Sequence, residues 1–70
     1  MKHRYNIYGI NNKDEFIRGT CLGYDMIHCI KLCEKQGIKL QKIEYFNLET
    51  ADLPVGIEKI EKIDFKPYTG

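Results

Sequence analysis

The sequence predicts a small α+β domain in which a mainly antiparallel sheet of three or four strands carries one helix on one face. Two segments with alternating apolar side chains surround a turn-forming run, and a segment with helical apolar spacing follows them. Further β-rich segments complete the chain, giving the expected element order ββαβ(β). Because the chain has only 70 residues, residues 1–70 are predicted to form a single domain with a small core.

The first two elements are predicted to form a hairpin. Residues 4–10 are rich in aromatic and β-branched side chains, which favours a strand. The polar run 11–15 predicts a turn, because Asn and Asp hydrogen-bond to their own backbone and tolerate left-handed dihedral angles. Residues 16–23 supply the second strand of this hairpin.

A helix is predicted after the hairpin. Asp25 is a good N-cap, because its carboxylate can accept a hydrogen bond from an amide of the first turn. Gly37 lies where the left-handed residue that ends a helix is expected. The apolar residues that recur between them at helical spacing are Met26, Cys29, Ile30 and Cys33.

The rest of the chain predicts a third strand, a loop and one ambiguous element. Residues 38–46 read as a strand whose alternation slips near Gln41, which indicates a bulge. Residues 47–56 contain Pro and Gly and read as a loop. For residues 57–66, apolar side chains spaced by three suit a short helix, whereas local alternation and the high content of Ile favour a strand.

Charge is unevenly distributed along the chain. Up to Lys42 there are eight basic and four acidic residues, and after it three basic and six acidic residues. We therefore expect the C-terminal segment to fold back on the basic part. The total of +1 argues against a nucleic-acid binder, for which a basic excess is typical.

The residue types that carry chemistry are sparse. The three cysteines are an odd number without a C-x-x-C pair, which favours buried apolar packing over a disulfide framework or a metal site. Serine is absent, no phosphate-binding loop occurs, and His28 and Cys29 diverge on a helix. We therefore expect no enzyme activity, cofactor or metal. No apolar stretch follows Arg4, so we expect a cytoplasmic protein that does not contact a membrane.

One family has a similar pattern over residues 5–43. The matching positions are Tyr5, Ile7 and Gly9 in the first strand, Asn11 and Asp14 in the turn, Gly19 and Cys21 in the second strand, Asp25 at the cap, and Cys29, Cys33 and Gly37 at the family's alanine, leucine and glycine positions. This segment resembles the ββα module at the N-terminus of the cytoplasmic domains in the type II secretion and type IV pilus inner-membrane platform family. The resemblance implies the fold of the module and no role.

The hairpin face turned away from the helix is the predicted interaction surface. Strand alternation places there an apolar set with an arginine, the composition found at the centres of protein interfaces. Its predicted contact residues are Tyr8, Ile10, Phe16, Arg18 and Leu22. The alternative is that residues 57–65 cover this face within the same chain. The expected function is a non-enzymatic binding protein that forms a homodimer or docks on a larger host protein, by analogy an accessory or inhibitory protein of a phage or mobile element.

A second function class stays open, in which the protein sequesters a small anionic ligand such as a nucleotide signal. Bases stack on aromatic rings and guanidinium groups, while phosphates bind cationic side chains. The predicted ligand-binding residues are Arg4, Tyr5, Tyr8, Arg18, Tyr24, Lys31 and Lys35.

Overall fold

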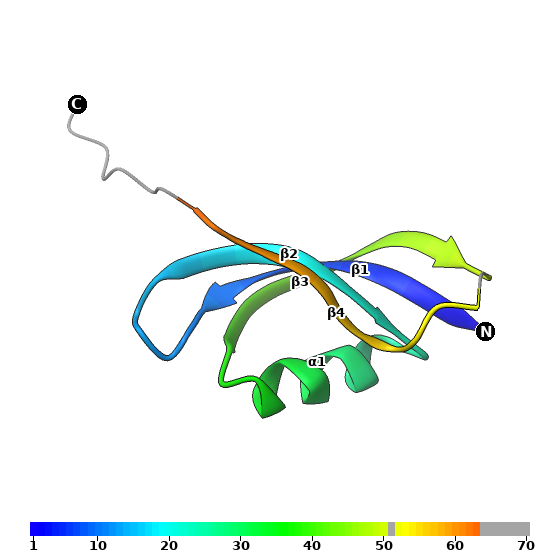
Figure 1. The fold of residues 1–70 in the computed structure, drawn as a ribbon, viewed down its shortest axis with the longest axis horizontal. Helices are drawn as coiled ribbons and strands as arrows, with labels where there is room; N and C mark the ends of the chain where they lie inside the picture. Colours follow the sequence, from blue (N-terminus) through cyan, green and yellow to red (C-terminus); the bar gives the residue numbers. More distant parts are fainter. Residues whose placement is uncertain (51, 64–70) are drawn as a thin grey trace.

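The computed structural model describes residues 1–50 and 52–63, which form one four-stranded sheet and one helix (Figure 1). The elements are β1 (Lys2–Ile10), β2 (Phe16–Gly23), α1 (Met26–Lys35), β3 (Lys39–Glu49) and β4 (Gly56–Lys62). All neighbouring strands are antiparallel, in the spatial order β3-β1-β2-β4. The predicted α+β class with an antiparallel sheet and one helix is confirmed. The spatial order was not predicted, because strand patterns do not specify which edge a later strand joins.

The β1–β2 hairpin is held by a turn that one asparagine organises. The Asn11 amide N–H donates to the Glu15 carbonyl at 3.0 Å. The Asn11 side-chain Oδ1 accepts the amide N–H groups of Lys13 and Glu15 at 2.9 and 3.0 Å. Asp14 has φ 61°, a left-handed conformation that Asp tolerates. The turn therefore lies where the sequence predicts it.

Both ends of α1 are capped as predicted. Asp25 Oδ1 accepts the His28 amide N–H at 2.7 Å, which satisfies a donor of the first turn. At the other end, Gly37 has φ 75°, and the Ile38 N–H donates to the Cys33 carbonyl at 3.0 Å. This is the Schellman arrangement, in which a left-handed glycine lets the chain turn back toward the sheet.

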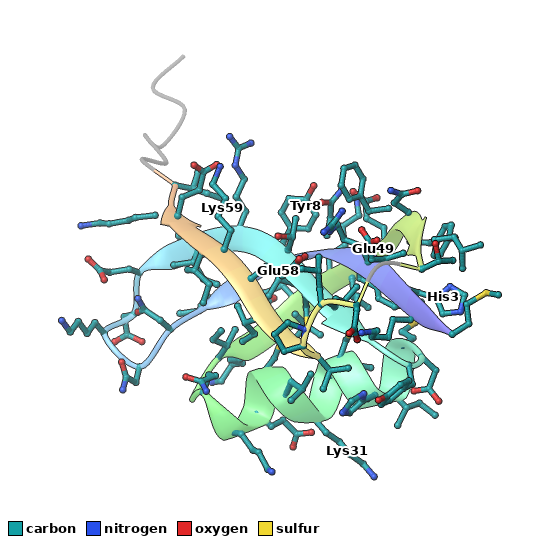
Figure 2. All side chains as sticks on the ribbon, turned by 45° about the vertical axis from the view of Figure 1, so that its right-hand side comes forward. His3, Tyr8, Lys31, Glu49, Glu58 and Lys59 are labelled. Atoms are coloured by element: carbon teal, nitrogen blue, oxygen red, sulfur yellow. The ribbon has the colours of Figure 1, made fainter. Side chains whose placement is uncertain are left out.

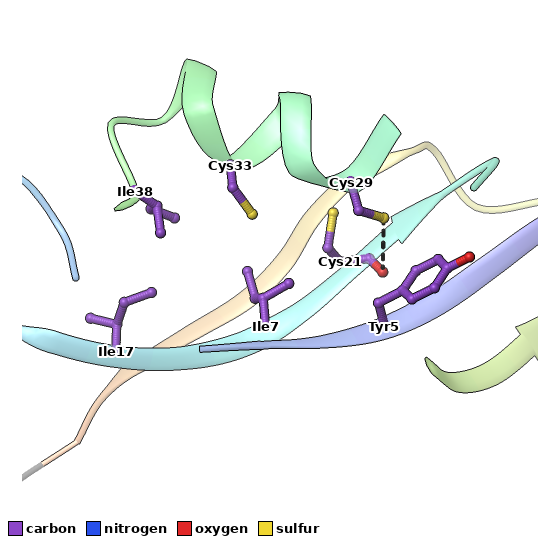
Figure 3. Close-up of a cluster of buried hydrophobic side chains, with 7 residues drawn as sticks. All are labelled: Tyr5, Ile7, Ile17, Cys21, Cys29, Cys33 and Ile38. Atoms are coloured by element: carbon purple, nitrogen blue, oxygen red, sulfur yellow. Dashed lines mark hydrogen bonds between the residues drawn. The ribbon is translucent and has the colours of Figure 1, made fainter. Parts of the chain in front are cut away.

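The core lies between α1 and the face of the sheet that we call the inner face (Figure 3). Strand alternation brings Ile7, Ile17 and Cys21 to this face, where none is more than 2% exposed. Cys29 and Cys33 meet them from the helix, four residues apart and fully buried. The core is completed by Tyr5 and Ile38. The predicted burial of all three cysteines is confirmed.

Two bulges interrupt the pairing of β3 with β1. At the first, Gln41 is an extra residue, because the pairs on either side join Tyr8 to Lys42 and Gly9 to Leu40. This bulge lies where the alternation slips in the sequence, as predicted. The second bulge leaves Phe46 as an extra residue of β3, and it was not predicted.

β3 also extends beyond its predicted end. Its last residue, Glu49, lies opposite Lys2, so residues 47–49 of the predicted loop belong to the strand. Cross-strand pairing with the start of β1 extends the strand past the polar residues that suggested a loop.

β4 (Gly56–Lys62) is a strand, and it joins the sheet at the free edge of β2. Gly19 of β2 permits this contact, because a Cβ atom there would lie 2.0 Å from the Lys59 carbonyl oxygen. The alternative in which residues 57–65 cover the outer face, opposite α1, is wrong for the described part of that segment, since β4 lies beside β2 in the sheet. Residues 64–66 of the predicted element lie outside the described residues.

Candidate functional site

The outer face collects the side chains that strand alternation assigned to it. β1 and β2 pair Ile10 with Phe16, Tyr8 with Arg18, and Arg4 with Leu22, so these residues share one face. Figure 2 shows Tyr8, Glu49, Glu58 and Lys59 on the side of the sheet opposite α1. The exposed fraction of Phe16 is 47%, and the side chains of Tyr8 and Ile10 are half-buried.

Ion pairs across the strands dominate this face. Arg4 binds the Glu58 carboxylate with two nitrogens, Nε at 2.7 Å and Nη2 at 2.8 Å, and its Nη1 lies 3.1 Å from Glu49. The hydrogen bonds from Arg4 hold the pKa of Glu58 below its ordinary value. Arg18 binds Glu61 at 2.6 Å. The outer face is therefore more polar than the sequence predicted, and its two arginines are already engaged.

Leu22 is not an exposed contact residue, and that part of the predicted surface is wrong. It is fully buried, although it lies on the outer face and outside the main core. Arg4 of β1 is its cross-strand neighbour, and the Arg4 guanidinium reaches Glu58 on β4, beyond β2. The Arg4 side chain therefore spans β2 near Leu22, in the way that long basic side chains lie along apolar surface.

A shallow hollow of about 240 Å³ lies on the outer face beside β4. Two cations border it, Arg18 and Lys59, but the Glu61 carboxylate that binds Arg18 borders it too. An anion would therefore compete with Glu61 for Arg18. The remaining residues that line the hollow are Asn6, Tyr8, Gly19 and Thr20.

The structure does not bring the seven predicted ligand-binding residues together. Tyr5 is buried on the inner face, whereas Arg4, Tyr8 and Arg18 lie on the outer face. Tyr24 precedes the helix and stacks on His28, with ring centroids 5.3 Å apart. The last two, Lys31 and Lys35, are exposed on α1, and Figure 2 shows Lys31 directed away from the sheet.

The thiols are arranged for packing. Burial raises the pKa of Cys21 to about 12 and that of Cys33 to about 11, and it also raises the pKa of Cys29. The Cys29 thiol is 3.9 Å from the Cys21 carbonyl oxygen, its hydrogen-bond acceptor. Such thiols are largely protonated at neutral pH, whereas the thiolate is the nucleophile and the metal ligand. No group of three or more His, Cys, Asp or Glu that could hold a metal occurs within residues 1–50 and 52–63.

Sequence reasoning missed an exposed apolar surface at the end of β3. We call it the β3 flank, and it consists of Tyr45, Phe46 and Leu48, which are 55%, 54% and 43% exposed. Its signal was an aromatic pair followed by a leucine, but the strand was expected to end at residue 46. Pairing with β1 carries it further and puts Tyr45 and Leu48 opposite Tyr5 and His3, on the inner face.

An aromatic cluster anchors the β3 flank to the sheet. The rings of Tyr45 and Tyr5 meet edge to face with centroids 5.8 Å apart, and His3 lies 5.8 Å from Tyr45. His3 Nδ1 is buried without a hydrogen-bond partner among the described residues. Further along β3, a hollow of about 290 Å³ separates the strand from α1, lined by Ile30, Leu40, Gln41, Lys42 and Ile43.

The helix that the structure describes, α1, is neither long enough nor apolar enough to cross a membrane. No protein-family model, curated protein or solved structure matches the chain. The resemblance of residues 5–43 to the secretion and pilus platform module therefore stays a prediction.

Proposed function

We propose that this protein is a non-catalytic binding domain that recognises another polypeptide through the β3 flank. The observation that carries the proposal is the exposure of Tyr45, Phe46 and Leu48 on one edge strand. Aromatic side chains in such positions supply much of the contact energy at protein interfaces. The side chains that could perform chemistry are otherwise engaged: the thiols are buried, and the outer-face arginines bind carboxylates.

The β3 flank is favoured over the outer face for two reasons. On the outer face Leu22 is buried and Arg18 is bound to Glu61, so fewer of its predicted contact residues are available to a partner than expected. Tyr45 of the β3 flank, in contrast, is held in place by the edge-to-face contact with Tyr5, so this side chain loses little entropy when a partner binds. A protein of this kind acts by occupying a surface of its partner, as an accessory or inhibitory protein does.

The test is selection of peptides from a displayed random-peptide library on the immobilised full chain. We expect peptides that bind the parent protein and lose binding to the double variant Tyr45→Lys/Leu48→Lys, because the variant places two charges in the contact surface. The matched control is Phe16→Glu, which places a charge on the outer face and leaves the β3 flank intact. Circular dichroism checks that both variants are folded.

Two outcomes would contradict the proposal. If the library yields no peptide that binds, the domain does not recognise extended polypeptides. If the selected peptides lose binding to Phe16→Glu and keep it to the double variant, the recognition surface is the outer face.

A further inference from the structure

β3 lies at an edge of the sheet, and no other strand of the described chain pairs with its free side. The hydrogen-bond pattern shows which residues face that side. Asn11 N–H donates to the Glu15 carbonyl, and antiparallel alternation then directs the backbone of Ile7 toward β2 and away from β3. Ile43 lies opposite Ile7, so its N–H and C=O groups point to the free edge.

The two edges of the sheet differ in what they offer a further strand. β4 at the opposite edge carries Glu58, Lys59, Glu61 and Lys62 in seven residues, and charges of this density discourage pairing with another chain. β3 is longer, with 11 residues, and ends in the exposed β3 flank. Its charges are also ordered: Lys39 and Lys42 precede Ile43, and Glu44 and Glu49 follow it.

We propose that the partner of this edge is a second copy of the chain, whose β3 pairs antiparallel with the first about a two-fold axis at Ile43. The proposal rests on the proposed function and names the polypeptide that is recognised. An antiparallel pair brings the basic half of one β3 beside the acidic half of the other. A two-fold contact of this kind uses the same surface on both copies and closes without further growth.

The register follows from two constraints. Residues directly opposite in an antiparallel pair lie on the same face, so a one-residue slip would set inner-face residues opposite outer-face residues. The axis must therefore pass through a residue rather than between two residues. Lys42, Ile43 and Glu44 lie between the two bulges of β3, where the alternation is intact.

Charge selects among the three possible centres. An axis at Lys42 would place Lys42 opposite itself, and an axis at Glu44 would place Glu44 opposite itself; like charges directly opposite are destabilising. Within one chain Lys42 Nζ lies 3.6 Å from Glu44, and an axis at Ile43 adds a contact of Lys42 in each copy with Glu44 of the other and sets Ile43 opposite Ile43. The hollow between β3 and α1, which Ile43 lines, lies beside this contact.

The decisive experiment measures the mass of the full chain by sedimentation equilibrium over a range of concentrations, for the parent and for charge variants. The parent should dimerise. Lys42→Glu and Glu44→Lys each create two like-charge pairs across the axis, and each should raise the dimer Kd by about tenfold or more. The double variant Lys42→Glu/Glu44→Lys exchanges the charges and should restore dimerisation.

The matched control is Lys31→Glu, the same charge change on the exposed side of α1. It should leave the Kd unchanged. A cross-link provides the second measurement, should a charge variant fail to fold. In the proposed register the two residues at position 43 lie opposite each other with their Cα atoms about 5.5 Å apart, which is within disulfide range. Mild oxidation of the variant Ile43→Cys should therefore give covalent dimers. The native cysteines are buried and should not contribute.

A parent chain that stays monomeric at all concentrations would overturn the self-pairing. So would a double variant that dimerises no better than the single variants, together with no cross-link at Ile43→Cys. If the parent is monomeric but library peptides bind the β3 flank, the proposed function stands and only the identity of the partner is wrong.

Discussion

Two local rules place the three cysteines of this chain. Cys29 and Cys33 are four residues apart on α1 and therefore share the helix face that meets the sheet. Cys21 reaches the same core from β2 by strand alternation. These rules are readable in the sequence, which is why the burial of all three could be predicted. The same burial raises their pKa values and keeps the reactive thiolate form scarce.

We expect no alkylation of the native protein by iodoacetamide at about pH 8, because the thiols are protonated and shielded there. After unfolding in urea, mass spectrometry should detect three adducts, one for each cysteine. An adduct formed in the native state at a rate close to that of the unfolded chain would show that the core opens readily at that cysteine.

At the scale of the elements, local pattern predicted what depends on neighbours in the chain. The hairpin, the helix caps and the bulge at Gln41 follow from residues close together in sequence. The end of β3 and the burial of Leu22 do not. The first depends on pairing with the start of β1, and the second on Arg4 reaching toward Glu58, which is 54 residues away in the chain. The β3 flank was missed for the same reason.

The junction of β2 and β4 depends on Gly19. We expect Gly19→Ala to destabilise the domain by about 1–3 kcal/mol in urea denaturation. The added Cβ atom would collide with the Lys59 backbone, and the backbone shift that relieves the collision costs free energy. The control is Thr20→Ala, which removes atoms from the adjacent position of the same strand. Equal unfolding midpoints for parent and Gly19→Ala would show that β4 packs against β2 less closely.

Over the whole molecule, the uneven charge distribution becomes a set of ion pairs that join the acidic second half to the basic first half, as expected. Arg4 binds Glu49 and Glu58, and Arg18 binds Glu61. In one further pair the base lies in the second half and the acid in the first: Lys62 binds Glu15 of the hairpin turn at 2.6 Å. Three of these pairs tie β4 to the first 18 residues, so the attachment of β4 depends on pH.

Stability should fall with acid. Neighbouring cations hold the pKa values of Glu15, Glu58 and Glu61 below their ordinary value of 4.5. A lowered pKa in the folded state contributes stability above the unfolded pKa, and that contribution is lost as the pH falls through the folded pKa. The urea concentration at the unfolding midpoint should therefore decrease as the pH is lowered below about 5.

Glu58→Gln should lower the midpoint at neutral pH and flatten its dependence on pH, because the bidentate pair with Arg4 is lost. The matched control is Glu34→Gln on the exposed side of α1, which should retain the slope of the parent. A parent midpoint that does not change between about pH 6 and pH 3 would mean that these pairs contribute nothing measurable.

β4 follows β3 in the chain yet lies at the opposite edge of the sheet, beyond β1 and β2. β4 pairs with β2 alone among the described strands, and it contributes only the partly buried Ile57 to the packing of the core. Segments with few buried apolar contacts open at a lower free energy than the core, so we expect β4 to detach first in local opening and to dock last as the chain folds. Hydrogen exchange of the Ile63 amide, which donates to the Phe16 carbonyl, would report that opening. While β4 is detached, Arg4 lacks its partner Glu58, and we expect Leu22 to be more exposed to solvent than in the folded protein.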